Sequence, residues 1–196
     1  DQYGDSKKKI WIAETGYSTK GDRAFVDSEG QQIDYLIRSM ILSFSEPRVE
    51  KFFLYRFGEG GIEGDFEVSH EIYRSLFTLS DIFSNFRFVS AVEKDDQYEY
   101  IFRAKRGRGR IRFIWNLLNT GQEVKLEGYK AYSTEGRSLQ DAVISTRPIM
   151  LAKHYIPKNF PLSYESVWVY EELLEENRGK FFTDLDIPFR CEEFPF

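Results

Sequence analysis

The sequence predicts a parallel α/β segment followed by an all-β region. Two observations carry this prediction. Residues 9 to 83 of the 196-residue chain read as strand, helix, strand and helix, and from about residue 86 only short strand candidates separated by turn residues remain. The hydrophobic content of 41% is enough to form a core. We therefore expect one large or two small globular domains.

The first strand, helix and second strand have clear local signals. Residues 9–13, Lys-Ile-Trp-Ile-Ala, are too few for a helix and are rich in strand formers. Ser28-Glu29-Gly30-Gln31 has the pattern of a capping box, and Pro47 lies where a helix would end. Between them apolar residues recur at helical spacing: Ile33, Leu36, Ile37, Met40, Ile41 and Phe44. The pattern predicts a helix over 29–45 and a second strand over 49–57.

A glycine-containing loop separates this second strand from a second predicted helix. Ser69 is a suitable N-cap, and Ile72, Leu76, Leu79 and Phe83 share one helical face. The centre of the preceding strand is continuously apolar, as in parallel sheets that are covered on both faces. The order of elements is therefore that of a parallel α/β fold.

The region after residue 86 predicts a small antiparallel β-sandwich. Its strand candidates cover residues 86–92, 98–104, 111–116, 123–127, 130–133, 142–145 and 149–153. The remaining tail contains a helical pattern flanked by prolines and is not assigned to a fold. The predicted organisation is an α/β portion over 1–85, the sandwich over 86–154 and the tail over 155–196.

Composition excludes several classes of function. The net charge of −5 disfavours a nucleic-acid partner, and the basic run 105–110 is interpreted as a solvated hairpin tip. One cysteine excludes an intrachain disulfide, and two histidines predict no metal cluster, so we expect no metal and no cofactor. No apolar run approaches the about 18 residues that span a membrane. Because the chain begins with Asp1 and not Met, the missing signal peptide leaves the compartment open, including secretion.

Glu14 is the first candidate for chemistry. The strand 9–13 runs directly into this carboxylate, and alternation places Ile10, Ile12 and Glu14 on one face. If that face lines a barrel, Glu14 lies at the carboxyl end of the strand, where barrel enzymes place catalytic groups. Gly16 lets the backbone turn away. The alternative is a glutamate that ends a strand and lies in water.

These residues resemble a known group of enzymes. Residues 10–18, Ile-Trp-Ile-Ala-Glu-Thr-Gly-Tyr-Ser, resemble the seventh barrel strand of the clan A retaining glycoside hydrolases, in which a Trp-Ile-x-Glu-x-Gly pattern carries the nucleophile. The helix at 29–45 resembles the seventh helix of that clan, and residues 49–57 its eighth strand. Residues 66–83 resemble the eighth helix with its lead-in, and 86–153 a sandwich domain that follows some of these barrels.

The resemblance implies the last two βα units of a (β/α)8 barrel and a double displacement with Glu14 as nucleophile. In the clan, the acid/base carboxyl group follows an asparagine on the fourth strand, but this chain has only two units and no Asn-Glu dipeptide. We therefore expect the rest of the barrel to come from the same precursor or from another chain. The acids of the loop after the second strand are the alternatives within this chain: Glu59, Glu63, Asp65 and Glu67.

Three aromatic residues are candidates for sugar binding. Tyr17 follows the proposed nucleophile, and Tyr55 and Phe57 end the second strand, where an aromatic ring can stack on a carbohydrate. Core packing is the alternative for each. The function predicted from the sequence is the nucleophile-bearing, C-terminal fragment or subunit of a retaining glycoside hydrolase, with a carbohydrate substrate. The alternative is a noncatalytic carbohydrate-binding or assembly subunit with a degenerate barrel remnant.

Overall fold

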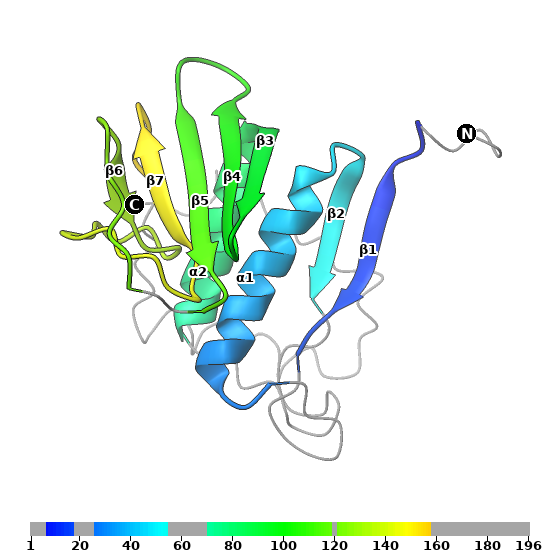
Figure 1. The fold of residues 1–196 in the computed structure, drawn as a ribbon. Helices are drawn as coiled ribbons and strands as arrows, with labels where there is room; N and C mark the ends of the chain where they lie inside the picture. The colour runs from blue at the N-terminus through cyan, green and yellow to red at the C-terminus, as the bar shows by residue number, and fades with distance from the viewer. Residues whose placement is uncertain (1–6, 18–25, 55–69, 119–120, 158–196) are drawn as a thin grey trace. The chain divides into compact units, whose positions relative to one another are not determined.

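The computed structural model describes residues 7–17, 26–54, 70–118 and 121–157 (Figure 1). Predictions for the glycine loop, the start of the second helix at Ser69 and the tail from residue 158 lie outside these residues. The elements in chain order are β1 (Ile10–Thr15), α1 (Glu29–Ser45), β2 (Val49–Leu54), α2 (His70–Asn85), β3 (Phe86–Lys94), β4 (Gln97–Ala104), β5 (Arg110–Asn116), β6 (Lys130–Tyr132) and β7 (Ile149–Lys153).

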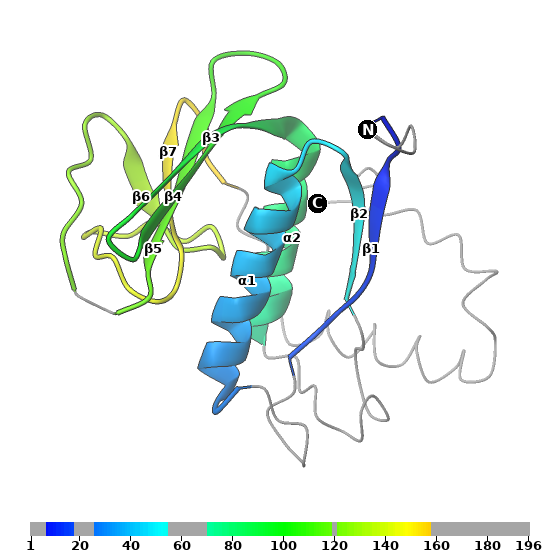
Figure 2. The ribbon, with the colours of Figure 1, turned by 45° about the vertical axis from the view of Figure 1, so that its right-hand side comes forward.

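The predicted strand–helix–strand unit is confirmed. β1 and β2 pair in parallel, with Ile12 opposite Phe52, and α1 connects them (Figure 2). The capping box forms: Ser28 Oγ accepts a hydrogen bond from the Gln31 amide at 3.2 Å, and Gln31 Oε1 accepts one from the Asp27 amide at 2.7 Å. These bonds satisfy amide groups that have no partner within the helix, which explains why α1 begins at Glu29.

The alternation that the sequence suggested for β1 is interrupted. The pairing with β2 shifts between Ile12 and Thr15, so one extra residue lies on β1 just where Glu14 occurs. Ile12 faces the same side as its partner Phe52, whose ring lies 6.3 Å from Phe44 of α1. The prediction that Ile10, Ile12 and Glu14 form one column toward a barrel interior is therefore wrong, because the isoleucine side of β1 is the side that α1 covers.

The second half of the described chain is a five-stranded antiparallel sheet with the strand order β3-β4-β5-β7-β6 (Figure 1). The tight β3–β4 turn uses Asp95 and Asp96, which have φ values of 50° and 62°, the backbone that a two-residue hairpin of the right twist requires. The predicted strands at 123–127 and 142–145 contribute only an isolated bridge between Glu123 and Val143. Within the described residues there is thus one sheet here and not the two of a sandwich.

Helices and a long loop cover the two faces of this sheet. On one face Phe102, Phe113 and Met150 form a core with Ile37 of α1 and Leu79 of α2. On the other, a smaller core combines sheet residues with side chains of the loops between β5 and β7: Ile114, Ile149 and Leu151 with Ala142 and Ile144. The loops therefore cover this face of the sheet, as a second sheet does in a sandwich. The domain boundary near residue 85 stays a prediction, although residues on both sides of it share the larger core.

Phe83 joins the helices to the sheet. Its ring stacks on Phe44 of α1 at 4.6 Å between centroids and lies 5.4 Å from Phe102 of β4. Such aromatic contacts stabilise a core beyond the area that they bury. α1 is thus fixed on one side to β2 and on the other to the sheet.

Two further observations concern the described residues. Neither α1 nor α2 is long and apolar enough to cross a membrane. Over the described ranges, no group of three or more His, Cys, Asp or Glu side chains is placed to hold a metal ion.

Tyr100 and Tyr155 lead to a prediction at alkaline pH. Burial, and a hydrogen bond to Glu93 and Asp81 respectively, raise the pKa of both phenols above the usual value. Because the folded-state pKa is the higher one, this contribution to stability is complete below the unfolded pKa of about 10 and is lost as the pH rises further.

We therefore expect both tyrosines to ionise only together with alkaline unfolding, when phenolate absorbance and circular dichroism are recorded during the same titration. Tyr155→Phe should reduce the phenolate absorbance only in the late phase of the titration, the phase that coincides with unfolding. A loss from the early phase, in which exposed tyrosines titrate, would contradict the assignment.

Candidate functional site

Glu14 lies at the carboxyl end of β1 and is exposed. Its side chain makes no hydrogen bond or ion pair with the residues that the structure describes. The interruption of the β1–β2 register at this point frees the carboxylate from the face that α1 covers. The geometry therefore presents a carboxylate at the strand end without fixing its oxygens to this part of the chain.

The face of β1 and β2 opposite α1 carries two exposed aromatic rings and is uncovered by the described residues. Trp11 is 57% exposed and Phe53 is 44% exposed, and their ring centroids lie 6.4 Å apart. Lys51 Nζ lies 4.2 Å from the Trp11 ring centroid, and Trp11 Nε1 donates to Glu50 at 3.1 Å. Parallel sheets normally have both faces covered, whereas this face of β1 and β2 is left open by the described residues.

The two-stranded sheet also has unpaired strand edges. Among the described residues β1 pairs only with β2, so the outer edge of each strand presents free amide and carbonyl groups. Free edges of this kind readily accept a further strand. Among the described residues, the β1–β2 sheet thus has one uncovered face and two unpaired edges.

α1 holds the segment that follows Glu14. The Tyr17 ring meets the edge of Tyr35 at 5.4 Å, its hydroxyl hydrogen-bonds Ser39, and the Gln32 side-chain amide donates to the Tyr17 carbonyl. The structure thus gives Tyr17 a packing role, and its role in sugar binding stays a prediction. The other sugar-binding candidates, Tyr55 and Phe57, and the loop acids from Glu59 to Glu67 lie outside the described residues.

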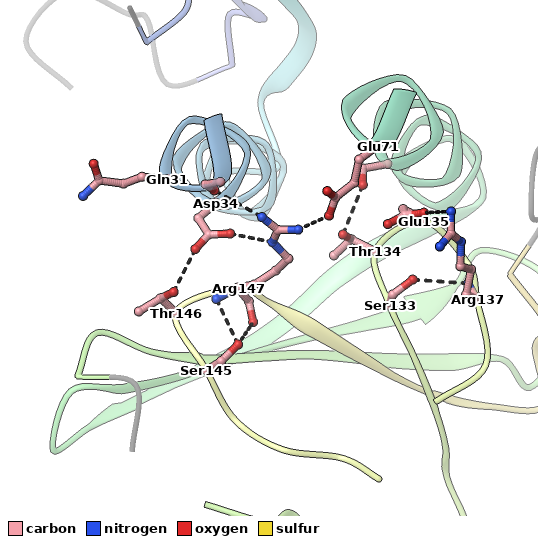
Figure 3. A network of polar contacts seen from close by, with 12 residues as sticks. Gln31, Asp34, Glu71, Ser133, Thr134, Glu135, Arg137, Ser145, Thr146 and Arg147 are labelled. Carbon is pink, nitrogen blue, oxygen red and sulfur yellow. Dashed lines mark hydrogen bonds and ion pairs between the residues drawn. The ribbon is translucent and has the colours of Figure 1, made fainter. Parts of the chain in front are cut away.

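A polar network centred on Arg147 fixes α1 and α2 to the loop before β7 (Figure 3). Arg147 Nε donates to Asp34 of α1 at 2.6 Å, Nη1 pairs with Glu71 of α2, and Nη2 donates to the Gly30 carbonyl at 3.2 Å. Thr146 Oγ1 donates to the second Asp34 oxygen at 2.8 Å. Charged hydrogen bonds of this kind are stronger and more directional than neutral ones.

Arg38 completes the network from within α1. Its guanidinium donates to the Thr146 carbonyl and lies 3.9 Å from Asp34, one helical turn away. Burial lowers the pKa of Arg38 from its usual value, while Asp34 opposes the shift. Sequence reasoning missed this network because an arginine in a loop has no local pattern that separates it from a solvated charge.

The structure also contains a cavity of about 520 Å³, but none of its lining residues belongs to β1 or β2. It lies between the end of α2 and the β4–β5 hairpin, with His154 and Tyr155 on its wall. Glu14 is therefore not part of this cavity.

Comparison with known proteins gives one informative similarity. No family model and no curated protein matches the chain. A family 39 glycoside hydrolase from the gut symbiont Bacteroides cellulosilyticus WH2 has a similar structure, with a TM-score of 0.55 and 14% sequence identity. The match covers 76% of this chain and 34% of that protein, so this chain spans about a third of the neighbour's length. At this identity the match shows similarity of fold alone, of a distant, glycoside hydrolase-like kind.

Removing the Arg147 charge should destabilise the fold. Arg147→Met leaves the Asp34 carboxylate, which is only 9% exposed, with less compensation, and we expect a loss of about 2 kcal/mol in the free energy of unfolding by urea. Arg48→Met is the control, because its pair with Glu46 is exposed, and it should leave the unfolding midpoint nearly unchanged. Equal effects of the two variants would show that the network carries no special stability.

The uncovered face should make the 196-residue chain associate with itself when it is alone. Phe53→Ser should weaken this association in sedimentation velocity, because it removes an apolar ring from that face. Leu42→Ser is a matched control, since Leu42 on α1 is also 44% exposed, as Phe53 is. If the Leu42 variant dissociates as readily as the Phe53 variant, the face opposite α1 is not the cause.

Proposed function

We propose that this chain is the C-terminal part of a retaining glycoside hydrolase in which Glu14 is the nucleophile. The observation that carries the proposal is the position of this carboxylate, at the carboxyl end of a parallel strand followed by a helix, a second parallel strand and a second helix. Parallel α/β folds bind ligands at this end of their strands. The similar fold of the family 39 glycoside hydrolase supports the same interpretation.

In this mechanism the ionised Glu14 attacks the anomeric carbon, and the bond from that carbon to the leaving oxygen breaks. A second carboxylic acid gives its proton to the leaving oxygen, and a glycosyl ester of Glu14 results. The second group then removes a proton from water, which attacks the same carbon and releases Glu14. The two carboxyl groups must lie about 5 Å apart for this double displacement.

The second carboxyl group is proposed to come from the remaining strands of a (β/α)8 barrel, in the same precursor or in another chain. The uncovered face with Trp11 and Phe53 and the open edges of the β1–β2 sheet support this. Exposure of Glu14 in the chain alone is consistent with it, since the carboxylate becomes enclosed only when the barrel closes.

The antiparallel sheet is proposed to brace the barrel portion. Arg147 and Thr146 hold Asp34 of α1, and α1 in turn holds Tyr17 through the Gln32 amide. In this way Arg147, which lies 130 positions after Tyr17 in the sequence, influences the segment directly after Glu14. We infer that the sheet helps to set the position of the nucleophile.

The alternative is a noncatalytic carbohydrate-binding or assembly subunit with a barrel remnant. One observation favours it. A nucleophilic carboxylate is normally oriented by hydrogen bonds, and the Glu14 side chain has none with the described residues. The two functions differ in whether Glu14 forms a covalent bond with a sugar.

The decisive experiment uses the assembled protein with its complete barrel. Glu14→Gln should lower turnover of an aryl glycoside at least about a thousandfold, because the amide cannot form the ester. Glu50→Gln changes a carboxylate at the opposite end of the neighbouring strand and should leave turnover within a few fold. An activated fluoro-sugar should label the peptide that contains Glu14, as seen by mass spectrometry. Turnover that survives Glu14→Gln together with a missing label would establish the noncatalytic alternative.

A further inference from the structure

Four cationic residues form a row across four neighbouring strands. The strand register pairs Arg87 of β3 with Arg103 of β4, Arg103 with Arg110 of β5, and Arg110 with Lys153 of β7. Residues that are paired in this way project from the same face of a sheet. Arg87, Arg103 and Arg110 are exposed and Lys153 is partly exposed, and these strands lie side by side in Figure 1. We call these four residues the cationic row.

The cationic row has no compensating acid among the described residues. Like charges at opposed positions of neighbouring strands destabilise a sheet. One position further along the same face of β5, Arg112 shows the usual solution: its guanidinium binds both oxygens of Glu99, at 2.7 and 2.9 Å. The sheet therefore pairs one arginine fully and leaves the adjacent row unpaired, in a chain whose net charge is −5.

Protection of an exposed sheet edge does not explain the cationic row. Exposed charges often protect edge strands from pairing with other chains. In the order β3-β4-β5-β7-β6, however, only Arg87 lies on an edge strand. Arg103, Arg110 and Lys153 lie on interior strands, where no edge needs protection, so three of the four charges need another explanation.

The surroundings of the cationic row are also basic. The hairpin tip adds Arg106 and Arg108, which are exposed and line the cavity of about 520 Å³ together with His154. Lys105 is used differently, since its ammonium group donates to the Ser84 carbonyl at the end of α2 at 2.7 Å. The cavity adjoins the same hairpin, but Phe86 and Ala104 on its wall belong to the core on the helix side of the sheet, whereas the cationic row projects from the opposite face.

We propose that the cationic row binds a linear anionic polysaccharide that lies across the strands. Neighbouring strands are spaced by about 4.8 Å, so the row offers cations at regular short intervals along a line. Arginine binds carboxylate and sulfate groups through two parallel hydrogen bonds, which suits repeated anionic substituents on a polymer. The Tyr129 ring lies 5.7 Å from Lys153 Nζ and 5.2 Å from the Arg112 guanidinium, so it makes cation–π contacts at the Lys153 end of the row.

The placement of exposed aromatic rings favours a polysaccharide over a nucleic acid. Proteins that hold single-stranded nucleic acid combine basic residues with exposed aromatic rings on which bases stack. Among the described residues, the large apolar rings that are exposed are those of Trp11 and Phe53. These two residues lie on β1 and β2 and not on this sheet. The choice of a saccharide rests on the proposed function, whereas the binding of a polyanion rests on the cationic row alone.

The test compares two double variants of the full chain that change net charge equally. Arg103→Gln/Arg110→Gln removes the centre of the cationic row. Arg48→Gln/Lys94→Gln removes two exposed cations from other positions, with side chains 41% and 79% exposed, whose acidic partners are also exposed. Binding to polygalacturonate, to dextran sulfate and to uncharged dextran is measured by affinity electrophoresis and calorimetry, at two salt concentrations.

We expect the unchanged chain to bind at least one anionic polymer and not dextran, with binding that weakens in salt. The row variant should lose at least about tenfold in affinity, and the control variant less than about twofold, because only the first removes the cations at the centre of the site. Polygalacturonate and dextran sulfate then distinguish carboxylate from sulfate recognition. Equal losses in both variants, or tighter binding of an RNA oligonucleotide than of either polymer, would overturn the proposal.

Two controls separate this proposal from folding and from the proposed function. The row variant should unfold at the same or a higher temperature than the unchanged chain, because it removes like-charge repulsion. A lower unfolding temperature would contradict the description of the row as uncompensated. The Glu14→Gln variant should bind the polymer as the unchanged chain does. The binding test therefore remains valid even when the proposed glycosidase mechanism is wrong.

Discussion

The placement of α1 depends on the Arg147 network more than on any other polar contact in the described chain. α1 lies between β2 and the antiparallel sheet, and its buried apolar side chains belong to the larger core. A guanidinium that binds Asp34, Glu71 and the Gly30 carbonyl fixes both the height and the rotation of the helix. The ionic contacts thus add directional constraints to the apolar packing of the core.

That constraint reaches the candidate site through α1. Tyr17 and Glu14 are separated by two residues, and α1 contacts Tyr17 through a ring, a hydroxyl and an amide. The loop before β7 is therefore connected through α1 to the segment that follows Glu14. Under the function proposed above, a rigid connection of this kind would help to position the reacting carboxylate.

The sequence predicted the elements whose causes are local. The capping box at Ser28 and Gln31 and the apolar spacing of α1 located that helix, because both signals lie within a few residues of one another. Two expectations failed for reasons that are not local. The extra residue near Glu14 reverses the alternation of β1, and the loop strands at 123–127 and 142–145 pack as irregular chain over Ile114 and Leu151.

The pairing of residues across strands is also invisible in a single sequence. Arg110 was interpreted as part of the basic hairpin tip at 105–110, and its alignment with Arg87, Arg103 and Lys153 emerged only from the register. The same holds for Arg147, whose partners lie 113 and 76 residues away. Long-range charge placement is set by the topology of the fold and not by neighbours in the chain.

Two glycines shape the β4–β5 hairpin for different physical reasons. A Cβ atom at Gly109 would lie 3.2 Å from the Phe86 ring and 3.3 Å from the Ala104 Cβ, closer than most packed side chains come, so these neighbours would have to shift by a few tenths of an ångström. At Gly107, two residues earlier, nothing lies within 4 Å, but its φ of 83° is one that L side chains rarely adopt. The hairpin thus favours glycine at residue 109 because of packing and at residue 107 because of backbone conformation.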